Sequence, residues 1–469
     1  MDDAGMGAKV RALRLREGMS QRQLAERLGV SASYLNLIEN NRRPLPAKIL
    51  LKAVQIFEVD LSAFSDDSDQ VLVDELRQVF GDPVLEDADV RVNELKKLAL
   101  HHPGAAQGLV KLYRAYRAGQ QAEPGAEPTQ EVPVERGHLP SEEVNDFIQA
   151  HKNHFPALED AAEALWMSAE LDADDLQKGL IDHLRWKHGV RVVFDRQVDH
   201  KAAVRAYDPD NRVLTLSVLL PPRSRNFHLA HHVALLDHPK LLDKTVVDPA
   251  LSPASRMLAR LVMANYFAGA VLMPYDAFVN AAREVRYDIE LLGHRFRTSF
   301  EQVCHRLTTL QRRGNKGVPF HMVRVDIAGN IAKRFSASGI HFARFSGACP
   351  RWNVFRAFLT PGVIRRQLSV MPDGEPYFCI ARTLSRSRGG YRAPTAVHAI
   401  GLGCRVDYAQ HLTYADGIDL EAPGELVEIG VTCRLCDRPD CTERAFPALQ
   451  SPLKIDPNVR MPSFYMVSS

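Results

Sequence analysis

Residues 224–238 read SRNFHLAHHVALLDH, and this run decides the fold of the middle of the chain. We expect it to form a helix. Residues four positions apart lie on one face of a helix, so His228 and His232 would be close enough to share a ligand.

The run is similar to the metal-binding helix of zinc peptidases, with its catalytic residues replaced. In the HExxH signature two histidines one helical turn apart bind the ion, and the glutamate activates the bound water. Here the frame begins at His231, His232 replaces the glutamate and Leu235 replaces the second histidine. Because leucine cannot coordinate a metal, we expect a pocket without peptidase chemistry.

The alternative is a zinc-dependent, peptidase-type regulator that cleaves a partner protein. Such an enzyme would need a replacement ligand set from the histidines of the same run, which are His228, His231, His232 and His238.

The composition is that of an ordinary globular protein. With 469 residues, of which 45% are hydrophobic and 25% charged, the chain has room for about two to four domains. A net charge of +2 predicts that any DNA-binding surface is local. The N-terminus lacks an apolar signal core and no apolar run reaches membrane-spanning length, so we expect a cytoplasmic protein with no membrane partner.

The N-terminal residues predict a pair of short helices joined by a tight turn. Ser20 is a suitable N-cap for a helix over residues 21–28, which Gly29 closes. Ser31 or Ser33 then caps a second helix over residues 34–40. This is helix-turn-helix geometry, in which the second helix enters the major groove of DNA.

Residues 20–25 (SQRQLA) and 31–44 (SASYLNLIENNRRP) resemble the Cro/C1-type helix-turn-helix family. The resemblance implies that Gln21, Asn41, Arg42 and Arg43 contact phosphates. It implies that base edges are contacted by Ser31, Ala32, Ser33, Tyr34 and Asn36. The alternative is a small helical bundle that binds protein instead of DNA.

Beyond this head, residues 66–118 show helical spacing of apolar residues, and residues 120–140 have the composition of a mobile linker. Residues 190–194, 203–207 and 212–216 predict strands, the last two as a hairpin around Asp208-Pro209-Asp210-Asn211. A small sheet followed by the helix at residues 224–238 resembles the ImmA/IrrE-type metallopeptidase-like domain.

Arginines and tyrosines interrupt the apolar faces of this domain, among them Arg205, Tyr207, Arg225 and Tyr266. A buried arginine is costly unless it is paired, and arginine binds phosphate in a bidentate manner. The set therefore indicates a pocket for an anionic ligand. The alternative is that these arginines pair with carboxylates of the same domain, such as Asp208, Asp288 or Glu301.

The C-terminal third predicts an antiparallel or mixed sheet, with strands near residues 321–325, 341–345, 377–381 and 397–402. Three thiols then follow within residues 433–441, namely Cys433, Cys436 and Cys441, and CxxC spacing lets thiolates surround one metal centre. We expect Cys349 as the fourth ligand, with Cys404 as second choice. A 4Fe-4S cluster and zinc both accept four thiolates, and free thiols are the alternative.

Several further segments resemble the short-chain fatty acyl transcriptional regulator family, which includes regulators of propionate catabolism and of the glyoxylate cycle. They are residues 264–270 (ANYFAGA), 299–311 (SFEQVCHRLTTLQ), 334–336 (RFS), 349–353 (CPRWN) and 433–441 (CRLCDRPDC), together with the helix-turn-helix residues.

The resemblance implies a non-enzymatic, homodimeric or homotetrameric regulator that binds double-stranded DNA and senses a short-chain acyl-CoA, with an iron-sulfur cluster in some members. It would regulate short-chain fatty acid or related carboxylate metabolism. Side-chain chemistry selects the acyl-CoA contacts as Arg205, Tyr207, Arg225, Tyr266 and Arg324.

The expected fold is therefore multidomain. It comprises an all-α helix-turn-helix head (1–64), a helical connector or dimerisation segment (65–119), a linker (120–140), an α+β metallopeptidase-like sensor domain (141–319) and an α+β Cys-rich C-terminal domain (320–469).

Overall fold

The computed structural model divides the chain into two compact units, which are described separately. The first contains the helices up to Gln120, and the second begins with the helix that starts at Pro140. The residues that the structure describes are 6–16, 19–39, 42–57, 67–82, 85, 90–120, 140–195, 204–340, 342, 348–387, 395–420, 426–434, 436, 438 and 440–447.

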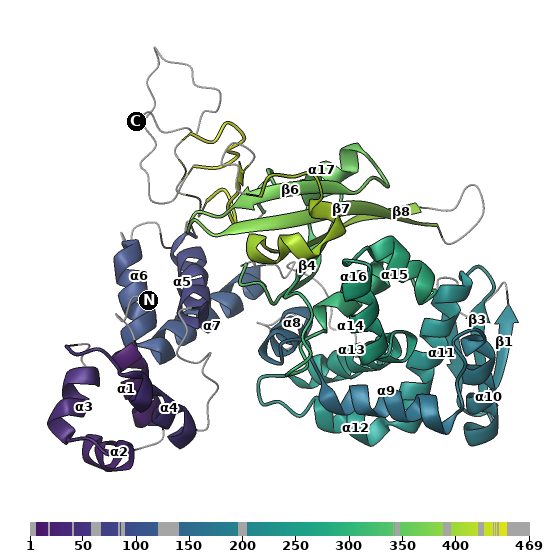
Figure 1. Cartoon of the computed structure of the whole chain (residues 1–469), viewed down its shortest axis with the longest axis horizontal. Coiled ribbons are helices and arrows are strands. Elements are labelled where there is room, and N and C mark those ends of the chain that lie inside the picture. Colours follow the sequence, from purple (N-terminus) through teal and green to yellow (C-terminus); the bar gives the residue numbers. More distant parts are fainter. Residues whose placement is uncertain are drawn as a thin grey trace. The chain divides into compact units, whose positions relative to one another are not determined.

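The first unit opens with four short helices, α1 (Met6–Arg16), α2 (Gln21–Leu28), α3 (Ala32–Glu39) and α4 (Ala47–Ile56) (Figure 1). The expected caps of α2 are confirmed. The Ser20 side chain accepts from the backbone N–H of Gln23, and Gly29 has a φ of 73°, which a residue with a side chain rarely adopts. Leu24, Leu35 and Ile38 are buried between these helices.

Three more helices complete the first unit, α5 (Asp67–Phe80), α6 (Val92–His101) and α7 (Pro103–Gln120). The Tyr113 hydroxyl donates to Asp82 at 2.7 Å, and Arg114 lies 3.0 Å from Glu75. These contacts join α7 to α5 and to the turn that follows α5, which confirms the expected helical character of this segment.

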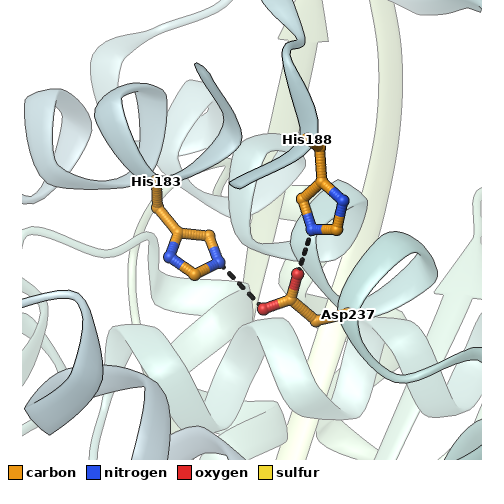
Figure 2. Close-up of side chains that lie close together, drawn as sticks. All are labelled: His183, His188 and Asp237. Atoms are coloured by element: carbon orange, nitrogen blue, oxygen red, sulfur yellow. Dashed lines mark hydrogen bonds and ion pairs between the residues drawn. The ribbon is translucent and has the colours of Figure 1, made fainter. Parts of the chain in front are cut away.

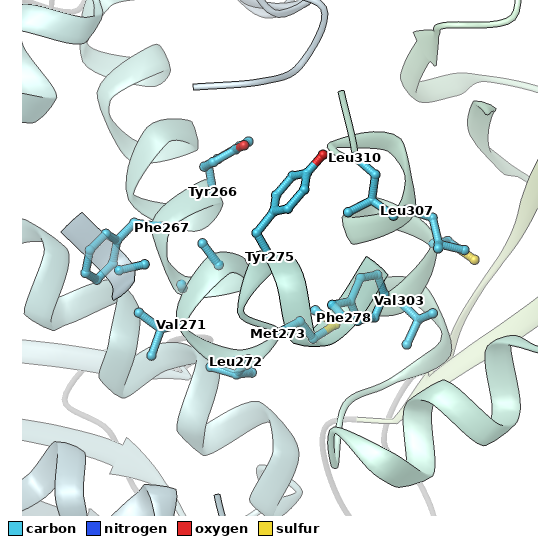
Figure 3. Close-up of a cluster of buried hydrophobic side chains, with 14 of the residues drawn as sticks. Tyr266, Phe267, Val271, Leu272, Met273, Tyr275, Phe278, Val303, Leu307 and Leu310 are labelled. Carbon is cyan, nitrogen blue, oxygen red and sulfur yellow. The ribbon is translucent and has the colours of Figure 1, made fainter. Parts of the chain in front are cut away.

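The second unit begins with a group of helices in which α13 (Pro253–Leu272) packs against α8 (Pro140–Ala150), α9 (Pro156–Ser168), α11 (Pro222–Asp237), α12 (Pro239–Thr245) and α16 (Phe300–Thr308). The other helices of the group are α10 (Leu176–His188), α14 (Tyr275–Glu284) and α15 (Ile289–Arg295). Side chains of α13, α14 and α16 gather in one apolar cluster that includes Phe267, Phe278 and Leu307 (Figure 3). The run that opened the sequence analysis is therefore a helix, α11, packed against α13 and α10.

A three-stranded sheet precedes α11, with β1 (Arg191–Asp195), β2 (Arg205–Asp208) and β3 (Val213–Ser217) in the order β1-β3-β2. The predicted hairpin is confirmed, since β2 and β3 pair antiparallel. The β1 and β3 strands pair parallel.

The C-terminal half of the second unit is a six-stranded sheet in the order β5-β4-β8-β7-β6-β9. The strands are β4 (His321–Asp326), β5 (Ile331–Ser336), β6 (Arg365–Val370), β7 (Pro376–Ser387), β8 (Thr395–Arg405) and β9 (Val427–Glu428). All neighbours pair antiparallel except β6 and β9, so the sheet is mixed, as expected. A short helix, α17 (Asn353–Arg356), and the 3₁₀ turns η3 (Ala357–Leu359), η4 (Val406–His411) and η5 (Thr413–Ala415) complete this half.

One face of the large sheet shares a core with the helices. Met322, Phe378 and Ile400 pack into the cluster that contains the helical residues. Their neighbours on the opposite face, such as Val323 and Ala399, belong to a separate cluster. Side chains alternate between the two faces of each strand, and those on one face pack against the helices. Residues on both sides of the expected domain boundary at 319/320 therefore share one hydrophobic core.

The segment between residues 288 and 311 forms two helices, because α15 ends at Arg295 and α16 starts at Phe300. Between them Arg297 has a φ of 53°, and Ser299 and Gln302 form a capping box that starts the new helix. The linker at 121–139 and most of the strand expected near 341–345 lie outside the described residues.

A buried ion pair joins α9 to α16. Arg306 donates to both oxygens of Glu159, at 2.6 and 2.8 Å, and both side chains are almost fully enclosed. The Tyr266 hydroxyl of α13 adds a hydrogen bond of 2.6 Å to the same carboxylate. Burial acts to raise the pKa of Glu159, but the Arg306 charge and these hydrogen bonds outweigh it and lower the pKa.

No single helix in the described part of the chain is long and apolar enough to cross a membrane. Together α13 and α14 pass on length and composition, although they are bent by 63°.

We predict that Glu159→Gln lowers the free energy of unfolding of the second unit by about 3 kcal/mol, because it leaves the Arg306 charge buried without a counter-charge. Urea unfolding measures the loss. In the unmutated chain this contribution is complete above the unfolded-state pKa of the carboxyl group and disappears as the pH falls through the lowered folded-state pKa.

The matched control is Glu163→Gln, since the Glu163–Arg312 pair is partly exposed and spans 2.9 Å. We expect it to change the free energy of unfolding by less than about 1 kcal/mol. If both substitutions lowered the free energy of unfolding equally, burial would not be the reason that the Glu159–Arg306 pair matters for stability.

Candidate functional site

The α3 helix, the second helix of the helix-turn-helix pair, presents short polar side chains to solvent. Ser31 caps α3, because its hydroxyl accepts from the backbone N–H of Tyr34 at 3.1 Å. Ala32, Ser33 and Asn36 are exposed on α3. A surface of this kind at the start of a helix suits the edges of bases.

Arg42 and Arg43 follow α3, and both are exposed. The guanidinium of Arg43 stacks on the Tyr34 ring, 4.9 Å from its centroid. Asn41, the neighbouring phosphate contact implied by the resemblance, lies outside the described residues. The described arginines and the exposed face of α3 are adjacent, as a reading helix with flanking phosphate contacts requires.

The head is held together by Glu39, which sequence reasoning missed. Its buried carboxylate accepts from Arg14 of α1 at 2.7 and 3.0 Å and from the Gln21 amide of α2 at 2.7 Å. Gln21, expected at a phosphate, thus uses its amide inside the head. The angle of α3 depends on this three-helix contact.

The second unit contains a cavity of about 1760 Å³ between its helices and its large sheet. Helices α8, α11, α13, α15 and α16 contribute to the wall, and so do β4, β5 and β7. The wall therefore extends past the metallopeptidase-like segment to which the sequence assigned the pocket.

The cavity wall combines apolar and basic side chains. Two glutamates line it, Glu290 and Glu301. The basic residues of the wall are more numerous, namely Arg223, Arg306, Arg324, Lys333, Arg334 and Arg382. Apolar side chains such as Phe227 and Met263 line the remainder. Arg306, Arg334 and Arg382 are paired with Glu159, Glu142 and Glu290, whereas Arg324 and Lys333 share the single carboxylate of Glu301. This remaining positive charge favours an anionic ligand with an apolar part.

Glu301 of α16 collects several partners at the wall. Its carboxylate lies 3.2 Å from Arg324 of β4 and 3.9 Å from Lys333 of β5. His305 and His398 lie 3.8 and 3.5 Å away. Burial lowers the pKa of His305 to about 4, and the charge of Lys333 adds to the effect, so this imidazole is neutral near pH 7.

Two of the five predicted ligand residues lie on the cavity wall. Arg324 lines it, and so does Tyr266, whose hydroxyl is bound to Glu159. Arg205, Tyr207 and Arg225 lie outside the lining residues.

Each of these three makes contacts within the protein. Arg225 donates to the carbonyls of Leu220 and Val218, both at 2.8 Å, and so holds the turn before α11. The Tyr207 ring packs 4.4 Å from the ring of His232. Arg205 contacts the Nδ1 atom of His231.

The Arg205 contact bears on the peptidase alternative. His231 is the first ligand in the HExxH frame, and here a guanidinium lies against its ring. Burial, and after it the charge of Arg205, lower the pKa of His231 to about 3, so the imidazole is neutral near pH 7. A fixed positive charge at this nitrogen opposes binding of a divalent cation there.

The cysteines of the C-terminal third come from two segments. A bridge between Ala348 and Thr432 brings Cys349 beside Cys433. Burial raises the pKa of the Cys349 thiol, and the neighbouring Cys433 and Cys436 raise it further. Cys404, the second choice for a fourth ligand, is instead enclosed in the core between helices and sheet.

Arg444 holds this cysteine loop together. Its buried guanidinium donates to the carbonyls of Cys433 and Cys436 at 2.9 and 2.8 Å, and its backbone N–H donates to the Cys441 carbonyl at 3.2 Å. The Arg444 side chain therefore holds the backbone at two of the three cysteines, Cys433 and Cys436.

Three segments of the chain match family models. Residues 10–64 match a helix-turn-helix model, residues 185–308 match the IrrE N-terminal-like domain, and residues 309–465 match the short-chain fatty acyl coenzyme A regulator, C-terminal.

Relatives match over nearly the whole length. The propionyl-CoA carboxylase regulator of Cereibacter sphaeroides is 41% identical over 97% of this chain and 96% of its own. The HTH-type transcriptional regulators PrpR and RamB of Mycobacterium tuberculosis are each 40% identical, over 96% and 100% of this chain and 93% and 99% of their own. A solved Mycobacterium tuberculosis transcriptional regulator is 42% identical, with a TM-score of 0.67 over 69% of this chain and 99% of its own.

The head and its exposed reading helix define the class of helix-turn-helix, DNA-binding transcriptional regulators. Within that class, the chain belongs to the family of short-chain fatty acyl-coenzyme A regulators.

We predict that Arg42→Ala weakens binding to every duplex and lowers the slope of log affinity against log salt by about 1, because one phosphate contact is lost. Ser33→Ala or Asn36→Ala should instead reduce discrimination at one base pair by about 1–3 kcal/mol. Fluorescence anisotropy with operator and scrambled duplexes over a salt series separates the two effects.

Lys96→Ala, an exposed substitution on α6 outside the head, is the control and should change neither quantity. If the affinity for both duplexes were insensitive to Arg42, Ser33 and Asn36 alike, this face of the head would not be the DNA interface.

Proposed function

We propose that this chain is a DNA-binding regulator of short-chain fatty acyl metabolism whose effector is a short-chain acyl-CoA bound in the cavity of the second unit. The observation that carries the proposal is the wall of that cavity, which combines an excess of arginine and lysine with apolar side chains. Its volume of about 1760 Å³ exceeds the roughly 300–1,000 Å³ of pockets for drug-sized ligands, so it suits a long molecule.

The chemistry of an acyl-CoA matches this wall in two respects. Its phosphates need guanidinium or ammonium partners, and Arg324 and Lys333 offer both. Its acyl chain needs apolar surroundings, which Phe227 and Met263 supply. The name of one relative, propionyl-CoA carboxylase regulator, supports the same class of effector.

Regulation would then follow from competition for the arginines. In the structure Arg324 and Lys333 share the Glu301 carboxylate. A ligand phosphate would draw both cations away from Glu301, and this exchange would loosen the connection that Glu301 makes between α16 and the strands β4 and β5. We propose a homodimer or homotetramer as the active form, because two half-sites need two heads.

We also propose that Cys349, Cys433, Cys436 and Cys441 hold a metal centre, a 4Fe-4S cluster or alternatively zinc, which would make regulation redox-sensitive. Four thiol donors from two segments have the chemistry for such a centre, and the carbonyls held by Arg444 support the loop. No three of these sulfur atoms lie within 4.8 Å of one another among the described residues, so the thiols would have to move together to bind the centre. When bound, the centre would supply electron transfer or a fixed cross-link between the two segments.

We expect Arg324→Gln to weaken binding of propionyl-CoA by at least about tenfold, because a charge-assisted contact to phosphate is worth about 1.5–3 kcal/mol. Isothermal titration calorimetry of the full chain measures the affinity. Arg260→Gln is the matched control, since Arg260 also pairs with a carboxylate, Asp243 at 2.7 Å, but lies outside the cavity lining.

Unchanged affinity in the Arg324 variant, or equal loss in the Arg260 variant, would remove Arg324 from the site. Absence of binding by the unmutated chain to propionyl-CoA and to other short-chain acyl-CoAs would sink the proposed effector class.

For the metal centre, we expect the Cys433→Ser, Cys436→Ser double variant to lose iron and sulfide, or zinc, and the corresponding visible absorption after purification without air. Metal analysis and absorption spectroscopy provide the readout. Cys379→Ser is the control, because this thiol lies against His321 at 3.5 Å, in the large sheet. Retention of the full iron and sulfide content by the double variant would contradict the assignment.

A further inference from the structure

Two histidines and an aspartate converge where α10 and α11 end (Figure 2). The Nε2 atom of His183 lies 2.8 Å from one oxygen of Asp237, and the Nε2 atom of His188 contacts the other oxygen. In the part of the chain that the structure describes, no other set of three such groups has its ligand atoms within 4.8 Å of one another.

Local structure explains why these side chains meet. His188 is the last residue of α10, and Gly189 then ends the helix with a φ of 66°. Asp237 is the last residue of α11, which packs against α10. The contact between the two helices therefore brings both imidazoles to the one carboxylate of Asp237. His183 and His188 are five residues apart, so the four-residue spacing of one helical face does not by itself bring them together.

The donor set is typical of zinc and similar divalent ions. Imidazole nitrogen and carboxylate oxygen bind zinc at about 2.0–2.2 Å, and three protein ligands leave a fourth position for water. In a tetrahedral site such ligand atoms are about 3.4 Å apart. The His183–Asp237 contact of 2.8 Å therefore needs to open by only about 0.6 Å, which side-chain rotation can supply.

Burial and access also fit an ion site. The Asp237 side chain is 2% exposed, so its charge requires compensation, whereas the His188 side chain is 21% exposed and leaves an entry path. The Lys187 ammonium lies 2.8 Å from Asp237 and supplies that compensation, although its side chain is 53% exposed. A side chain so exposed can leave for solvent when another cation arrives.

We propose that His183, His188 and Asp237 form a binding site for a zinc-type divalent ion, and that Lys187 is the counter-cation which the ion displaces. The site is separate from the acyl-CoA cavity, since none of these residues lines it. It also differs in chemistry from the cysteine centre, because its ligands are nitrogen and oxygen. Bound there, the ion would cross-link α10 to α11.

The test uses the full-length chain carrying Cys433→Ser and Cys436→Ser, which reduces thiolate binding. We expect one equivalent of zinc to bind, measured by competition with a chromophoric chelator. Cobalt in its place should give ligand-field bands without thiolate charge transfer.

Four single substitutions in this background identify the ligands. His183→Gln and Asp237→Asn should each weaken zinc binding by at least about 100-fold, because loss of even an outer partner costs about 10–100-fold. His411→Gln removes an exposed histidine elsewhere and should change nothing. Lys187→Met should tighten binding, because it removes the competing cation.

The variants also distinguish ligation from a purely structural role. His183→Gln keeps a hydrogen-bond donor for Asp237, so its metal-free circular dichroism and melting temperature should match those of the parent. Absence of a bound equivalent, or equal zinc affinity in the His183, Asp237 and His411 variants, would overturn the site. Unchanged or weaker binding in the Lys187 variant would overturn the displacement of Lys187.

Discussion

The ion pair between Glu159 and Arg306 is the constraint on which the second unit depends. It is bidentate and almost fully enclosed, and the Tyr266 hydroxyl shares the same carboxylate. Arg306 also donates to the carbonyl of Met273 at 2.9 Å. Because a buried pair pays a large desolvation cost, its main effect is to specify one arrangement of α9, α13 and α16.

That arrangement sets one wall of the cavity. Tyr266 and Arg306 both line it, so the helical side is held rigidly by groups that also hold the fold. The opposite wall comes from the large sheet, where Arg324 and Lys333 reach Glu301. The helical wall is therefore fixed by the hydrogen-bonded network around Glu159. The sheet wall has two cations that share the Glu301 carboxylate, so it is better suited to respond to a ligand.

Local features of the fold were predictable from the sequence. The caps of α2 at Ser20 and Gly29, and the hairpin between β2 and β3, follow from residue preferences that act over a few positions. The break between α15 and α16 was also readable, since Ser299 and Gln302 have capping-box spacing. The helical spacing of apolar residues alone does not show this break.

The site was less predictable, because its contacts join residues far apart in sequence. Cys349 and Cys433 lie near each other because a bridge joins Ala348 to Thr432, and their expected role as ligands of one centre stays a prediction. Nothing local indicated that Arg205 faces His231, that Glu39 joins three helices, or that the cavity wall continues into the sheet. The ligand roles of the cavity and cysteine residues remain predictions.

The Arg205–His231 contact limits what substitutions in α11 alone could restore. A chain that regained only the glutamate at His232 and the histidine at Leu235 would restore the HExxH letters while a guanidinium still lay against the first ligand. Three coordinated changes, the third of them on β2, would be needed before an ion could bind there. Substitutions confined to α11 would therefore not create an ion site of the HExxH type at His231.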